Sequence, residues 1–74
     1  MARPPIDPKD VQLGPVLFEF VQQGAYVRVS AIDSWTNTEV TVVGNPAAGE
    51  AAMRRTALNK LRYVIAKGGK GLNG

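Results

Sequence analysis

The 74-residue sequence predicts a small α+β domain: a three-stranded antiparallel meander covered on one face by a single C-terminal helix, in the order β-β-β-α. Two observations predict this fold. Three short stretches rich in β-branched and aromatic residues come first, separated by turn signals. One long stretch with apolar residues at helical spacing follows them. The spacers between the strands are too short for a parallel crossover, so neighbouring strands must run antiparallel.

The predicted folding unit covers residues 16–67, between a lead-in and a tail. Residues 1–15 hold four of the five prolines. We expect this proline-rich, extended lead-in either to be poorly ordered or to lie along the domain surface. Residues 68–74 are mostly glycine and predict a flexible tail. A unit of about 50 residues is near the lower limit for an independent core, so self-association would stabilise it.

The strands are expected at residues 16–22, 25–33 and 39–43. Gln23-Gly24 is typical of a tight turn, and residues 34–37 predict a second turn. Alternation along the strands places one set of apolar side chains on the face that the helix covers: Phe18, Phe20, Val27, Val29, Val40 and Val42.

The helix is expected to begin after Asn45, which suits an N-cap, with Pro46 at the first helical position. Only Gly49 interrupts good helix formers before Lys67, and Gly68 is a plausible stop. At 100° per residue, five apolar side chains form the stripe that would cover the sheet: Ala57, Leu58, Leu61, Val64 and Ile65.

The face of the sheet that points away from the helix is unusually apolar for a solvated surface. Scattered surface hydrophobes are one explanation. We favour the other, a patch that a second subunit or a protein partner covers, because the domain is small and its sheet has two open edges. The candidate interface residues are Leu17, Val21, Tyr26, Ile32 and Val43.

Positive charge is concentrated in the helix. Residues 1–45 carry a net charge of −2, residues 46–67 carry +4, and the tail adds one lysine. The candidate nucleic-acid contacts are Arg55, Lys60, Arg62, Lys67 and Lys70. A solvated helix with cations near its C-terminus explains the pattern better than a nucleic-acid face, because these residues surround the exposed arc without forming one strip.

Two further features have alternative explanations. Glu50 and Arg54 fall within the apolar stripe one turn apart, which favours an i,i+4 ion pair over a site for a charged ligand. Trp35 lies in a polar turn and is either a lid over the open end of the core or an exposed anchor. We favour the lid.

The sequence lacks the parts for most chemistry. It contains no cysteine and no histidine, which excludes thiolate nucleophiles, zinc fingers and an imidazole base. No phosphate-binding glycine motif is present, and the carboxylates lack metal-ligand spacing. We therefore expect no enzyme activity, no cofactor and no metal. Without a membrane span or a signal-peptide core, we expect a cytoplasmic protein.

Three resemblances follow from this order of elements. The segments Phe18-Glu19-Phe20, 27–33, 39–44 and 57–64 resemble a group of short, uncharacterised alphaproteobacterial proteins over about residues 16–66, which implies bacterial origin and no assigned activity. The order of elements is also similar to the second half of the double-stranded-RNA-binding domain. That family has lysines at the helix start, where this sequence has Ala47-Ala48-Gly49-Glu50-Ala51-Ala52.

The plant-type three-stranded DNA-binding domain is similar in order too, and its sheet reads DNA with arginines and tryptophans. Here the corresponding face offers Arg28 beside Glu19 and Glu39, which would repel phosphate. The sequence therefore predicts a non-enzymatic binding module that self-associates through its exposed sheet face. The alternative is weak, sequence-independent nucleic-acid binding through the basic helix.

Overall fold

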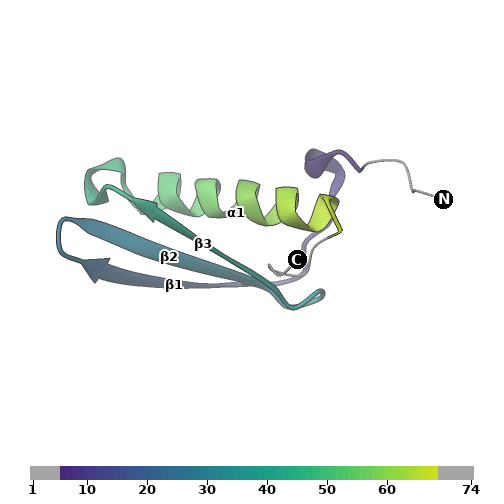
Figure 1. The fold of residues 1–74 in the computed structure, drawn as a ribbon, viewed down its shortest axis with the longest axis horizontal. Coiled ribbons are helices and arrows are strands. Elements are labelled where there is room, and N and C mark those ends of the chain that lie inside the picture. The colour runs from purple at the N-terminus through teal and green to yellow at the C-terminus, as the bar shows by residue number, and fades with distance from the viewer. Residues whose placement is uncertain (1–5, 69–74) are drawn as a thin grey trace.

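A computed structural model describes residues 6–68 and confirms the predicted β-β-β-α fold (Figure 1). A short 3-10 helix, η1 (Pro8–Asp10), precedes strands β1 (Val16–Gln23), β2 (Tyr26–Asp33) and β3 (Thr38–Gly44). A second 3-10 turn, η2 (Pro46–Ala48), then leads into α1 (Glu50–Ala66). The sheet has the order β1-β2-β3 with antiparallel neighbours, and α1 packs against one face of it.

The first hairpin has a two-residue turn that explains its register. Gln23 pairs with Tyr26, so only Gly24 and Ala25 lie between the strands. Gly24 has φ of 62°, whereas Ala25 has no positive φ. A glycine with positive φ at the first central position is typical of a type II′ turn, whose twist matches that of the strands. The turn therefore lies one residue later than the predicted Gln23-Gly24: β1 continues through Gln23, and β2 begins at Tyr26 and not at Ala25.

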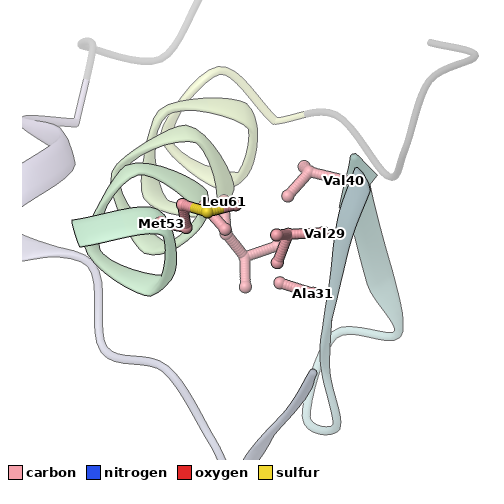
Figure 2. Packing of buried hydrophobic residues seen from close by; sticks show 6 residues of the cluster. Val29, Ala31, Val40, Met53 and Leu61 are labelled. Carbon is pink, nitrogen blue, oxygen red and sulfur yellow. The ribbon is translucent and has the colours of Figure 1, made fainter. Parts of the chain in front are cut away.

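The core lies between α1 and the two strands β2 and β3. Its buried apolar side chains are Val29, Ala31, Val40, Met53, Ala57 and Leu61, and Figure 2 shows the labelled ones meeting between helix and sheet. The predicted Phe18, Phe20, Val27 and Val42 pack around this cluster and are half-buried. Leu61 is fully buried, as the stripe predicts, and Met53 extends the buried stripe by one further turn.

The helix begins later than the sequence predicts. The side chain of Asn45 accepts a hydrogen bond from the N–H of Ala47 at 2.8 Å, so it caps the 3-10 turn η2 and not the α-helix. Gly49 follows with φ of 91° and ψ of 151°, a conformation essentially restricted to glycine. A continuous helix from Ala47 is therefore wrong, and α1 begins at Glu50. Its predicted end is confirmed, because Gly68 has φ of 81°.

The lead-in contacts the domain through η1 and through residues 13–15. η1 lies against the C-terminal half of α1, and Leu13 packs against the core cluster. The carbonyl of Pro15 accepts hydrogen bonds from the N–H and the hydroxyl of Ser34, at 3.0 and 2.7 Å. Residues 8–15 therefore lie along the domain. Residues 1–5 and the predicted glycine-rich tail from residue 69 lie outside the described residues.

Candidate interaction surfaces

The outer face of the sheet, which points away from α1, consists of cross-strand rows that the register defines. One end row contains Leu17, Ile32 and Glu39, and the other contains Val21, Arg28 and Val43. A polar row separates them: Glu19, Ser30 and Thr41. Tyr26 lies beyond the second end row, opposite Gln23. All five candidate interface residues are therefore on this face, divided into two apolar groups by the polar row.

The apolar side chains of the outer face differ in exposure. Leu17, Tyr26 and Val43 are 63%, 46% and 60% exposed, whereas Val21 and Ile32 are half-buried among their neighbours. Each apolar group contains one charged residue, Glu39 in the first and Arg28 in the second. Within residues 6–68 neither of these two makes an ion pair. The two end rows thus have matching apolar character and opposite charge.

The candidate nucleic-acid contacts do not form one basic surface. The ammonium group of Lys60 donates a hydrogen bond to the carbonyl oxygen of Thr41 at 2.9 Å, at the edge of β3. The Nζ atom of Lys67 lies 5.1 Å from the centre of the Tyr63 ring, a cation–π contact. Arg55 is exposed, and Lys70 lies outside the described residues. These contacts disperse the basic side chains around the helix.

The fifth basic candidate, Arg62, lines an open cleft between η1 and α1. The cleft has a volume of about 360 Å³ and is lined by Asp7, Pro8, Lys9, Asn59, Arg62 and Tyr63. Lys9 and Asp7 form an exposed ion pair of 3.4 Å at this site. Because Asp7 and Lys9 balance each other, Arg62 contributes the net positive charge of this cleft.

Glu50 and Arg54 form the i,i+4 ion pair that their spacing predicts, with an N–O distance of 2.5 Å. The guanidinium carbon of Arg54 also lies 5.2 Å from the centre of the Phe18 ring and 5.6 Å from that of Phe20. Because α1 lies over β2 and β3, this arginine is what covers the two rings on β1. The Arg54 side chain thus covers the phenylalanine rings at the β1 side of the core.

A cluster around Asp33 joins the lead-in, β2 and the second turn. The carboxylate of Asp33 is fully buried and accepts hydrogen bonds from the N–H of Gly14 at 2.6 Å and the N–H of Thr36 at 2.9 Å. The Thr36 hydroxyl donates to the same carboxylate at 2.7 Å. From the sequence, Asp33 is predicted only as the last residue of the second strand, and this role is missed. Its inward position in the alternation, three residues before a threonine, was the available signal.

The environment of Asp33 changes its pKa. Burial alone raises the pKa of this carboxyl. The hydrogen bonds from the side chain and backbone of Thr36 and from the backbone of Gly14 and Trp35 outweigh burial and lower the pKa below its ordinary value. Asp33 is therefore a structural carboxylate that stays ionised at neutral pH.

Trp35 lies beside this cluster. Of the two predicted alternatives, a lid over the core and an exposed residue, the structure shows the exposed one. Its side chain is 67% exposed, so the prediction of a lid over the core is wrong. Its ring lies against the backbone of Gly14, where an added Cβ would overlap it. The lead-in, not the tryptophan, covers this end of the core, because Leu13 packs there.

Residues 6–68 contain no group of three or more carboxylate, histidine or cysteine side chains that would hold a metal ion. None of the helices described is long and apolar enough to cross a membrane.

Comparison with known proteins identifies a family. The family described as "Domain of unknown function (DUF6898)" matches residues 13–68, which include all three strands and α1. No curated protein and no solved structure matches the chain. The match agrees with the predicted resemblance to an uncharacterised group, whereas the bacterial origin and the likeness to RNA-binding domains stay predictions. Since the match covers most of the sequence, the chain belongs to the DUF6898 family.

Proposed function

We propose that this chain is a non-enzymatic, cytoplasmic interaction module that self-associates through the outer face of its sheet. The observation that carries the proposal is the arrangement of the two end rows, each apolar and each with one charge of opposite sign. Exposed leucine, tyrosine and valine side chains on one sheet face are costly to leave in water and mark a surface that another molecule covers.

Two-fold symmetry makes these rows complementary. A dimer with two-fold symmetry uses the same surface on both subunits, so each end row can meet the opposite end row of the other copy. With the axis through the central polar row, the Leu17–Ile32 group of one copy faces the Val21–Val43 group of the other. Arg28 then faces the row that contains Glu39 of the second copy, which lies one strand to the side. Within one chain these two residues belong to rows about 13 Å apart, so only a second copy brings them together.

Sedimentation equilibrium at micromolar concentration tests the proposal. We expect a mass above that of the 7.9 kDa chain, and we expect Ile32→Glu to lower it by placing a charge in an apolar contact. Ala51→Glu, an exposed helix position, is the matched control and should leave the mass unchanged.

A charge-reversal pair makes the test specific to the proposed geometry. Arg28→Glu and Glu39→Arg should each weaken association, because each brings like charges together across the interface. The double variant Arg28→Glu/Glu39→Arg should restore it. A chain that is monomeric at millimolar concentration, or a double variant no better than the single ones, would contradict the proposal.

A further inference from the structure

The two edges of the sheet are protected differently. At the β3 edge, Lys60 donates its hydrogen bond to the carbonyl oxygen of Thr41, so a charged side chain from α1 occupies that edge. In the part of the chain that the structure describes, no side chain makes a hydrogen bond of this kind to the edge of β1. One edge of the sheet is therefore covered and the other is open.

The lysine contact also shows which groups point out of the β1 edge. Because the carbonyl of Thr41 points away from β2, its opposite residue Ser30 does not bond to β3 and bonds instead to Glu19 on β1. Hydrogen-bonding direction alternates along a strand. Phe18 and Phe20 therefore direct their N–H and C=O groups away from β2, toward the open edge.

Apart from the single charge of Glu19, β1 lacks the usual features that prevent an edge strand from pairing. It runs for eight residues, VLFEFVQQ, in unbroken register with β2 and contains no lysine, proline or bulge. Its β-branched and aromatic residues favour extended structure. On its inner side, the rings of Phe18 and Phe20 are only half-buried and are covered by Arg54. A strand added at this edge would bury more of both rings.

We propose that β1 pairs antiparallel with β1 of a second copy, about a two-fold axis at Phe20, to form a continuous six-stranded sheet. Only registers that place inner side chains opposite inner side chains keep both helices on one face. A register centred on Glu19 would place two glutamates directly opposite each other, which is destabilising. The register centred on Phe20 places Glu19 opposite Val21 and Phe20 opposite Phe20, and it still pairs residues 17–23.

Charge complementarity supports a second copy of the chain as the partner at the β1 edge. Arg54 lies over Phe18 and Phe20, whereas Glu50 lies one helical turn earlier, beside Gln22 and Phe20. In the Phe20-centred register, Phe18 faces Gln22 of the second copy. Arg54 of each chain then lies across the junction from Glu50 of the other, which extends the existing ion pair into a four-residue network.

This contact is separate from the one in the proposed function. It uses the edge of β1 and leaves the outer face of the sheet free, so each contact can exist without the other. The chain has no cysteine, so engineered cysteines report on the edge without interference. Residues 19 and 21 would form a non-hydrogen-bonded pair across the axis, with Cα atoms about 4.5 Å apart, which suits a disulfide.

The first experiment mixes Glu19→Cys and Val21→Cys chains, both also carrying Ile32→Glu to disable the outer face, under mild oxidation. We expect the mixed disulfide dimer to exceed either homodimer. A predominance of the Glu19→Cys homodimer would overturn the Phe20-centred register, and the absence of any enriched cross-link would overturn edge pairing altogether.

The second experiment compares Gln22→Pro with Gln22→Ala. The N–H of Gln22 points toward the open edge, so proline removes a donor from the proposed pairing while the β1–β2 ladder stays intact. In the Ile32→Glu background, we expect Gln22→Pro to weaken dimerisation by about tenfold or more, and Gln22→Ala to leave it unchanged. A dimer unaffected by proline would overturn the proposal. If Ile32→Glu chains are already monomeric, the β1 edge does not pair and this proposal is overturned. The proposed outer-face contact would then be unaffected.

Discussion

At the scale of single residues, Asp33 does the most to organise the molecule. Its buried carboxylate accepts hydrogen bonds from the backbone of Gly14 and Thr36. The lead-in, the end of β2 and the second turn therefore meet at one charge. The Thr36 hydroxyl, which donates to it, also contacts the hydroxyl of the buried Thr38 at 2.8 Å. Every buried side-chain nitrogen or oxygen within residues 6–68 has a partner, so removing this charge would leave several donors unsatisfied.

Asp33→Asn should therefore destabilise the fold by about 1–3 kcal/mol at pH 7, because the amide nitrogen would face donors. The sign of the pH dependence follows from the lowered pKa of Asp33. A carboxyl with a lowered folded-state pKa stabilises the fold above its unfolded pKa, about 3.9. This contribution is lost as the pH falls below that value and through the folded pKa.

Urea unfolding at pH 7 and at pH 3 measures both effects. We expect the stability difference between the parent and Asp33→Asn to shrink at pH 3. Asp10→Asn, which removes an exposed carboxylate from the same lead-in, is the control and should be nearly neutral. An equal deficit for Asp33→Asn at both pH values would show that the charge is not what stabilises the cluster.

At the scale of elements, the sequence predicts the strands to within about one residue, because alternation and turn chemistry agree there. It misplaces the start of the helix, because Asn45-Pro46 satisfies the same capping chemistry at a 3-10 turn as at an α-helix. The positive φ of Gly49, which separates the two, depends on where the chain must turn back over the sheet. Met53 was similarly missed, because its burial depends on the position of α1 over β2 and β3.

Leu61 tests whether α1 covers the sheet with the predicted face. It is fully buried, whereas Leu58 on the same helix is half-buried. We expect Leu61→Ala to cost about 2–5 kcal/mol, most of the stability of so small a domain, and Leu58→Ala to cost clearly less. Thermal unfolding followed by circular dichroism measures both. Equal losses for the two variants would mean that α1 packs with a different face.

At the scale of the whole molecule, the outer face and the basic helix were both visible in the sequence as candidate surfaces. Within residues 6–68 the candidate residues of both surfaces are exposed or half-buried. The sequence indicated that the basic side chains do not form one strip, but it did not indicate how the apolar side chains are grouped or which contacts the basic ones make. Cross-strand register divides the apolar residues by the row containing Ser30. Long-range contacts, such as that of Lys60 with Thr41, disperse the positive charges. Both depend on pairings between distant segments, which a linear pattern does not contain.

The dispersed charges predict weak nucleic-acid binding at most. We expect neither RNA nor duplex DNA to bind with a dissociation constant below about 100 μM at physiological salt. This value is the weak end of ordinary non-specific binding. Titration of labelled RNA and DNA at several salt concentrations tests this, with Arg62→Glu as the charge-reversal control. Tighter binding that weakens with salt at a log–log slope near about −3, and that Arg62→Glu reduces equally for all sequences, would support the alternative function.

The hydrogen bond from Lys60 to Thr41 has a consequence for how large an assembly can become. Pairing through β1 about a two-fold axis leaves the β3 strands outermost, and at each of them a lysine already occupies a backbone acceptor. A further chain that docked there would have to displace and bury an ammonium group. We therefore expect growth along the sheet to stop at two chains, so that the helix that covers the core would also protect the protein against open-ended, amyloid-like polymerisation.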